Sequence, residues 1–303
     1  MTLPDYTNCT LCPRMCHVNR HETTGYCGCS DHILAARAAL HKWEEPVLSG
    51  PEEEPGGSGA VFFSGCTLRC CFCQNFVLSK EHFGKELTPA QLGDAFLHLQ
   101  DQNAYNINLV TPTQFFPDII KTLDLVRHKL HIPVVCNCGG YERVETLREL
   151  EGLVDIYLPD MKYSNANLAA KLSRAPDYVE TAKAAIQEMY RQVGSAVIED
   201  DIMQRGLIVR HLILPGELDN TLGVLDWFAE TFPKADVLFS LMSQYVPMGK
   251  AKKLPPYDRK ITEEEYDAAI SYLDFLGIES GFTQDFTSAT EDYIPDFSFE
   301  GIE

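Results

Sequence analysis

Short apolar runs alternate with amphipathic stretches along most of this chain. From residue 60 onward, six runs have the length and composition of buried strands, namely 60–63, 106–110, 132–135, 154–158, 207–214 and 237–241. Between these runs, apolar residues recur at helical spacing, as in 92–99, 119–130 and 178–189. We interpret these stripes as packing faces of helices.

Two helix starts are marked by capping signals. Thr88 and Pro89 predict an N-cap and a first helical position. Thr262 and Glu265 predict a capping box in front of the last amphipathic stretch. The chain therefore contains well-delimited helices between its apolar runs.

This alternation predicts the α/β class, with a parallel sheet and helices outside it. Six strands are too few for a closed eight-stranded barrel, so a partial barrel or a doubly wound sheet would fit. In either fold the chemistry gathers where the strands end. The loops after the predicted strands hold polar residues and cysteines, at 64–75, 111–114, 137–142, 159–162, 215–217 and 243–245.

Composition divides the chain into three parts. We expect a cysteine-rich N-terminal metal-binding segment over 1–48 and a barrel over 49–250 that opens with a Gly-, Pro- and Ser-rich loop at 49–59. A helical tail should cover 251–303.

The charge balance limits the partners. The 25 Lys and Arg residues against 44 Asp and Glu give a net charge of −19, and no basic run is present. Nucleic acid is therefore disfavoured, because its phosphates need clustered cations. No apolar run has the length of a membrane span, and the first residues lack the pattern of a secretory leader. We expect a cytoplasmic protein without membrane contact.

The eleven cysteines form groups rather than a scatter. In a reducing compartment such groups more often bind metal than form disulfides, and an odd total argues against a complete disulfide set. The N-terminal group, Cys9-x2-Cys12-x3-Cys16-x10-Cys27, suits a tetrahedral zinc, and a second iron–sulfur cluster is the alternative. Cys29 is left over.

The central group reads Cys66-x3-Cys70-x2-Cys73 within "FFSGCTLRCCFCQN". Three thiolates in place of four would leave one iron of a cluster open to a ligand. Cys71 follows Cys70 directly, so its side chain projects differently and joint ligation is awkward. The alternatives for this loop are a zinc site or buried free cysteines. The corresponding alternative for the protein is an iron–sulfur or zinc binding protein without catalytic activity.

The central spacing, with Phe72 before the last cysteine, resembles the CxxxCxΦC signature of the radical S-adenosylmethionine (radical SAM) superfamily. Three further stretches, "VVCNCGGYERVETL", "VDIYLPDMKY" and "GLIVRHLILPG", resemble the subgroup related to pyruvate formate-lyase activating enzymes. The N-terminal "CTLCPRMCHVNR" is typical of that subgroup. The resemblance implies a partial (β/α)6 TIM-like barrel.

The resemblance also implies cofactors and a reaction. Cys66, Cys70 and Cys73 would hold a [4Fe–4S] cluster, and S-adenosylmethionine would chelate the open iron through its amino and carboxylate groups. Reductive cleavage would then give a 5′-deoxyadenosyl radical that abstracts hydrogen from the substrate. The electron donor is expected to be a flavodoxin or ferredoxin. A glycyl residue of a partner enzyme, or a small-molecule or lipid-like compound, could be the substrate.

The same resemblance places the S-adenosylmethionine contacts. Related enzymes bind the methionine amino group with a Gly-Gly-Glu stretch, where this chain has Thr111-Pro112-Thr113-Gln114 and thus no carboxylate to pair with an ammonium. Asn137 is expected near the ribose, although a turn-forming role is as plausible. The remaining candidates for cofactor binding are Phe72, Thr111, Thr113, Gln114, Asp160, Lys162, Arg210 and Gln244. Cys136, Cys138 and His211 are expected to pack.

Overall fold

The computed structural model of the protein describes residues 5–51, 53–289 and 296–302. Parts of the predicted N-terminal segment, linker and tail, at 1–4, 52, 290–295 and 303, lie outside the described residues. Among the described helices, none is long and apolar enough to cross a membrane.

A parallel sheet of six strands forms the centre of the fold. Their spatial order is β9-β8-β6-β5-β4-β2, and every neighbouring pair is parallel. These are the six predicted strands, and the structure bounds them as β2 Gly57–Phe63, β4 Ala104–Val110, β5 Val134–Cys138, β6 Ile156–Pro159, β8 Ile202–Leu212 and β9 Leu238–Met242. The prediction of an α/β fold is confirmed.

Four further strands extend the sheet. On the β2 side, β1 (Ile33–His41) runs antiparallel to β2 and to β3 (Lys85–Leu87). On the other side, β10 (Gly281–Thr283) pairs with β9, and β7 (Val197–Glu199) pairs with β8. The sheet order runs from β10 to β3 without joining, so within the described residues the barrel is open, as a partial barrel requires.

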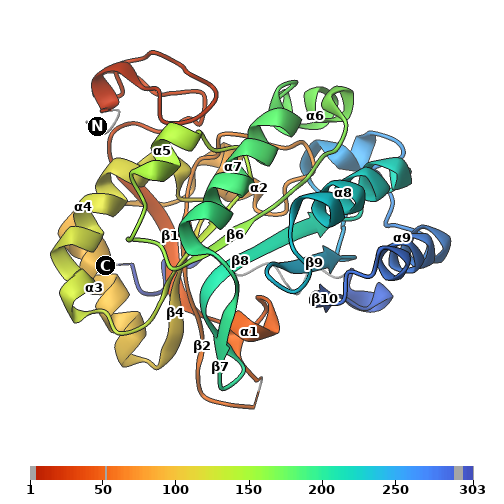
Figure 1. Cartoon of the computed structure of the whole chain (residues 1–303). Coiled ribbons are helices and arrows are strands. Elements are labelled where there is room, and N and C mark those ends of the chain that lie inside the picture. Colours follow the sequence, from red (N-terminus) through yellow and green to blue (C-terminus); the bar gives the residue numbers. More distant parts are fainter. Residues whose placement is uncertain (1–4, 52, 290–295, 303) are drawn as a thin grey trace.

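The helices follow the strands in the predicted alternation. Thr88 caps α3 in a complete capping box, and Thr262 does the same for α9, so both predicted helix starts are confirmed. In Figure 1 most helices lie around the outside of the sheet. The helices span α1 Pro46–Ser49, α2 Phe76–Glu81, α3 Pro89–Asp101, α4 Phe116–Val126, α5 Val144–Arg148, α6 Ala166–Ser173, α7 Tyr178–Val193, α8 Leu218–Thr231 and α9 Glu263–Leu276.

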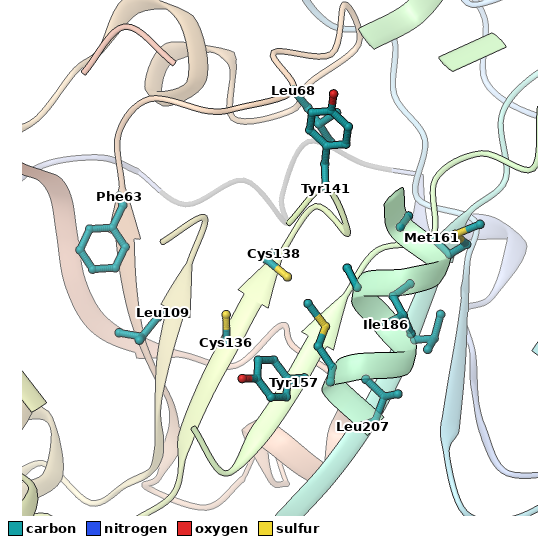
Figure 2. Close-up of a cluster of buried hydrophobic side chains, with 14 of the residues drawn as sticks. Phe63, Leu68, Leu109, Cys136, Cys138, Tyr141, Tyr157, Met161, Ile186 and Leu207 are labelled. Carbon is teal, nitrogen blue, oxygen red and sulfur yellow. The ribbon is translucent and has the colours of Figure 1, made fainter. Parts of the chain in front are cut away.

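The main core lies between the sheet and the outer helices. Figure 2 shows part of it, where Cys136 and Cys138 of β5 lie near Tyr157 and beside the helix α7 that carries Ile186. Because side chains alternate along a strand, Asn137 between these cysteines faces the inside of the barrel. Both thiols are buried, as expected for packing residues.

The short helix α1 fills the inner side of the open barrel. Leu48 is fully buried against apolar residues that point inward from β5, β6, β8 and β9. The amide of Asn106 in β4 donates to the Leu48 carbonyl at 2.8 Å, which fixes the helix to the sheet. The segment before the predicted linker therefore forms the floor of the barrel. We call residues 43–49, which carry this helix, the floor segment.

Shortening the Leu48 side chain of the floor helix should destabilise the fold. Replacing Leu48 by Ala leaves a cavity against the inward residues of four strands. We expect the free energy of unfolding to fall by about 2–5 kcal/mol, measured by urea denaturation.

A matched control is Leu125→Ala on α4, where the side chain is 54% exposed. There we expect a change within about 0.5 kcal/mol, because exposed positions contribute little. Equal losses in the two variants would contradict the role assigned to the floor helix.

Candidate active site

A cavity of about 840 Å³ opens inside the barrel. Its lining comes from three sources, which are the central cysteine loop, the ends of the parallel strands and the floor segment. Each source supplies polar or sulfur-bearing side chains, among them Cys66, Cys70, Glu142, Asp160, Arg210 and Glu45. The predicted gathering of chemistry at the strand ends is therefore found, with the floor segment as an additional contributor.

The central loop leaves β2 through a tight turn. Gly65 has a φ of +81°, a conformation that other residues rarely adopt, and an added Cβ would meet the Cys29 sulfur. The Gln114 side-chain nitrogen donates to the carbonyls of Ser64 at 3.0 Å and Gly65 at 3.3 Å. Gln114 thus holds the loop from behind and does not line the cavity, although the sequence suggested a cofactor contact.

The three cysteines of the signature face the cavity together. Cys66, Cys70 and Cys73 all line it, whereas Cys71 does not. Burial and the neighbouring thiols of Cys70 and Cys73 raise the pKa of Cys66 to about 12. Burial also raises the pKa of Cys73, and thiols with a raised pKa stay protonated unless a positive group such as a metal binds them.

Backbone and hydroxyl donors point at these sulfurs. The amides of Leu68 and Arg69 donate to the Cys66 sulfur at 3.4 and 3.5 Å, and the Ser173 hydroxyl donates to the Cys70 sulfur at 2.9 Å. Such hydrogen bonds stabilise thiolates and tune the potential of iron–sulfur clusters. The donor set therefore fits a cluster.

Among the described residues, no three His, Cys, Asp or Glu side chains converge tightly enough to hold a single metal ion. A cluster makes a different demand, because each thiolate binds a separate iron and the sulfurs stand farther apart. The arrangement of the central loop is compatible with that demand.

The four N-terminal cysteines also share one neighbourhood. Burial, together with the neighbouring thiols of Cys27, Cys16 and Cys9, raises the pKa of Cys12 to about 12. The Tyr26 amide donates to the Cys16 sulfur at 3.2 Å. The structure therefore places these cysteines near one another, but within the described residues they do not converge as tightly as a single zinc ion requires.

Arginines connect the N-terminal segment to the cavity loops. The Arg14 guanidinium donates to the carbonyls of Thr67 at 2.8 Å and Ser173 at 2.9 Å, and it lies 4.1 Å from the ring centre of Tyr26. Arg20 donates to the Gln114 carbonyl at 2.7 Å. Both arginines belong to "CTLCPRMCHVNR", where only the cysteines had been given a role.

Cys29, the cysteine left over by the spacing, lies between the two cysteine groups. Its thiol donates to the Ser64 carbonyl at 3.4 Å, at the base of the central loop. It also forms a side-chain hydrogen bond with Cys27. Cys29 therefore packs the N-terminal group against the central loop.

A buried ion-pair network crosses the cavity wall. Arg210 of β8 lies 3.0 Å from Asp160 through its Nε, and Lys162 lies 2.5 Å from the other Asp160 oxygen. Burial acts against the charge of Asp160, yet Arg210 and Lys162 hold its pKa below the usual range. Arg210 also donates to the Asn137 side-chain oxygen at 2.5 Å. The predicted residues in β5 and β8 and those just after β6 thus converge.

Glu142 supplies a carboxylate that the sequence analysis did not assign. It follows the two glycines after β5, is 1% exposed and lines the cavity. The Thr113 hydroxyl donates to its Oε1 at 3.0 Å, while Oε2 has no hydrogen-bond partner among the described residues. Burial raises the pKa of Glu142 to about 7, although Thr113 and the weakly donating Cys138 thiol oppose this.

The expectation that no carboxylate lies near Thr111 and Thr113 is therefore corrected. The carboxylate comes from the next strand end, so a search confined to the loop after β4 missed it. Thr111 lines the cavity as well, with its amide bonded to the Asn137 carbonyl at 2.8 Å.

The remaining predicted residues lie at the cavity or behind it. Phe72 and Gln244 line it, and the Phe72 ring lies 5.9 Å from that of Tyr245. His211 lies away from the cavity, with its ring nitrogens within hydrogen-bond distance of Met161 and Thr221. It packs in the core, as expected.

The solved structures that match this fold share little sequence identity with this chain. A domain of pyruvate-formate lyase-activating enzyme from Bacteroides vulgatus is 14% identical, covers 57% of this chain and 94% of its own, and has a TM-score of 0.42. SuiB of Streptococcus suis bound to S-adenosylmethionine is 15% identical over 77% of this chain and 47% of its own, with a TM-score of 0.48. Methylornithine synthase (PylB) is 15% identical over 69% and 59% of the two chains, with a TM-score of 0.47.

The comparison of sequences gives a firmer relationship. No family model matches this chain. The uncharacterized protein MJ0674 of Methanocaldococcus jannaschii is 32% identical over 284 residues, which cover 90% of this chain and 76% of the relative. The chain therefore belongs to the same protein family as MJ0674.

Proposed function

We propose that this protein is a radical SAM enzyme whose cavity holds a [4Fe–4S] cluster and S-adenosylmethionine. The observation that carries the proposal is the division of the central cysteines. Cys66, Cys70 and Cys73 line one cavity and Cys71 does not, which is the division that the CxxxCxΦC signature requires. When bound, the two cofactors supply one-electron cleavage of S-adenosylmethionine and hydrogen abstraction from the substrate.

The residues of the chain would position these groups and exclude water. The three thiols hold the cluster, supported by the amides of Leu68 and Arg69 and by the Ser173 hydroxyl. Phe72 and Tyr245 add an aromatic wall beside the loop. This enclosure protects a reactive site from solvent.

The charged residues suit the methionine part of S-adenosylmethionine. Lys162 and Arg210 offer positive charge toward its carboxylate, with Asp160 orienting both. Glu142 offers the free Oε2 oxygen to its ammonium group. A buried acceptor without a partner is unfavourable, so an ammonium donor there would be bound strongly.

The N-terminal cysteines Cys9, Cys12, Cys16 and Cys27 would bind zinc or a second iron–sulfur cluster. Arg14 and Arg20 link that segment to the loops around the cavity, so its metal would support the central site. The electron would come from a flavodoxin or ferredoxin, as in the enzymes that the motifs resemble.

Two substrate classes are compatible with this chemistry. The motifs resemble activating enzymes, which favours a glycyl residue of a partner enzyme. A small molecule or lipid-like compound is the second candidate, and the charged lining of the cavity at Glu44 and Glu45 favours it, because a backbone glycine carries no charge.

Single cysteine variants test the cluster assignment. Cys70→Ala should lose the iron of the central loop and produce no 5′-deoxyadenosine from S-adenosylmethionine and dithionite. Cys71→Ala should retain both, because its thiol lies outside the cavity. Anaerobic iron counting and chromatography of the products measure the two properties.

The same counting on a Cys66/Cys70/Cys73 triple Ala variant gives the metal that remains on the N-terminal cysteines, as zinc or iron. An intact cluster in Cys70→Ala, or a wild-type cluster that forms no 5′-deoxyadenosine, would refute the enzymatic proposal.

Glu142→Gln tests the ammonium contact. The amide oxygen can still accept from Thr113, but the charge that attracts an ammonium is lost. We expect the dissociation constant for S-adenosylmethionine to rise about tenfold or more, since hydrogen bonds to charged groups are the stronger ones. Equilibrium dialysis on anaerobically reconstituted protein measures it.

Binding of 5′-deoxy-5′-methylthioadenosine is the control, because this compound lacks the amino group of the methionine part. Its affinity should be the same in the wild type and in Glu142→Gln. If both ligands lose affinity equally, Glu142 does not bind the ammonium.

A further inference from the structure

The floor segment directs two acidic side chains into the cavity. Glu44 and Glu45 immediately precede α1, and their side chains are only 10% and 7% exposed. The Ser49 hydroxyl lies within 3.2 and 3.4 Å of their two backbone carbonyls, and Leu48 is held by Asn106. The backbone that carries the two carboxyl groups is therefore held in place.

The positive charges beside them are already engaged. Lys162 and the Nε of Arg210 both bind Asp160. Arg210 reaches Glu44 through Nη1 at 3.4 Å, and the same nitrogen is 3.9 Å from Glu45 Oε2, beyond hydrogen-bond distance. Three carboxyl groups thus share two cations.

Glu45 is the carboxyl group that these two cations compensate least. Its Oε2 is buried and has no hydrogen-bond partner among the described residues. Burial and the nearby Glu44 raise the pKa of Glu45 to about 7, although Arg210 and the Ser240 hydroxyl oppose this. A buried carboxylate without full compensation is unfavourable, and a cation brought by a ligand would relieve it.

The neighbours of Glu45 differ from those of Glu142, the carboxylate that accepts from the Thr113 hydroxyl. The charged groups that act on Glu142 are Asp160 and Lys162, whereas those that act on Glu45 are Arg210 and Glu44. The two carboxyl groups therefore lie beside different charged neighbours, and we treat them as two acidic positions of one cavity.

Aromatic side chains complete the surroundings of the floor segment. Trp43, the residue before Glu44, lines the cavity, and Phe282 of β10 does as well. Aromatic faces beside a carboxylate suit an organic cation with an apolar stem, because the ring attracts the charge and the stem packs on it.

We propose that Glu45, supported by Glu44, is a subsite for a cationic group of the substrate, an ammonium or guanidinium on an apolar stem. This inference rests on the proposed function, in which S-adenosylmethionine occupies the region of Glu142 and the substrate fills the rest of the cavity. It assigns the enzyme a positively charged substrate.

A binding experiment with a matched pair of probes tests the subsite. The probes are n-butylammonium and n-butanol, which differ in charge at nearly the same size. Ligand-detected NMR on anaerobically reconstituted protein, with saturating S-adenosylmethionine present, gives their dissociation constants. We expect n-butylammonium to bind the wild type at least tenfold more tightly than n-butanol, and Glu45→Gln to abolish that preference.

Glu180→Gln is the control variant, because it makes the same charge change at an exposed position of α7 and should leave the preference intact. Displacement of n-butylammonium by S-adenosylmethionine would overturn the proposal, since Glu45 would then bind the amino group of the cofactor. Equal binding of the two probes, or a preference that survives in Glu45→Gln, would also overturn it. None of these outcomes changes the cleavage assay that tests the proposed function.

Thermal unfolding separates a ligand subsite from a structural ion pair. If Glu45 were a structural partner of Arg210, Glu45→Gln would lower Tm, as Asp160→Asn should. A subsite that awaits a cation predicts instead that Glu45→Gln leaves Tm unchanged or raises it at pH 8.

The pH dependence has a defined sign. Glu45 takes up its proton more readily in the folded protein than in the unfolded chain, whose ordinary pKa is 4.5. The wild type should therefore lose stability relative to Glu45→Gln as the pH rises from about 4.5 to about 7. Glu44, Asp160, Arg210 and Lys162 are retained in both proteins, so the difference reports Glu45 together with its effect on Glu44. A lower Tm for Glu45→Gln at pH 8 would overturn the assignment.

Discussion

The charge of Arg210 has to be compensated inside the barrel, and much of the cavity is arranged around that requirement. A guanidinium removed from water is unfavourable by several kcal/mol unless acceptors surround it. Asp160 meets it from β6, Asn137 from β5 and Glu44 from the floor segment. One side chain of β8 therefore ties two neighbouring strands and the floor helix together, and it also sets the charge that a ligand meets.

The central loop depends on contacts from distant parts of the chain. Its backbone is held by the Gln114 side chain from the β4 side and by Arg14 from the N-terminal segment. Gly65 provides the close approach that lets Cys29 pack against the base of the loop. Since carbonyl groups of the loop accept these bonds, its cysteine side chains are left to face the cavity. The N-terminal segment thus supports the loop whatever metal it binds.

The sequence was sufficient where the signal is local. Apolar runs and capping residues identify the six parallel strands and helices α3 and α9, because each pattern lies within one element. The spacing of Cys66, Cys70 and Cys73 likewise lies within one loop. Strand β1 escaped detection because its alternation is built from alanines and ends in the cysteine-rich segment, and β3, β7 and β10 are too short to carry a pattern.

The cavity charges could not be predicted, because they come from residues far apart in the chain. Glu142 meets Thr113 across two strand ends, and Glu45 reaches the interior only because α1 folds back into the barrel. Nothing local in "KWEEPVLSG" distinguishes these carboxylates from a solvated acidic pair. Gln114 is the opposite case. It lies at the strand end where the sequence predicts a cavity residue, but its side chain bonds to the backbone of the central loop and does not line the cavity.

Taken together, the two acidic positions constrain how the cavity can be filled. An ammonium group bound at Glu142 meets Asp160 and Lys162, whereas one bound at Glu45 meets Arg210 and Glu44. Whichever position remains is still a buried carboxyl group that must keep a proton or find another cation. Two cationic groups bound at once would compensate both carboxyl groups. This condition is met when S-adenosylmethionine, which has an amino group, and a cationic substrate share one cavity. The fixed backbone of the floor segment then acts with Arg210 to orient the second ligand toward the first.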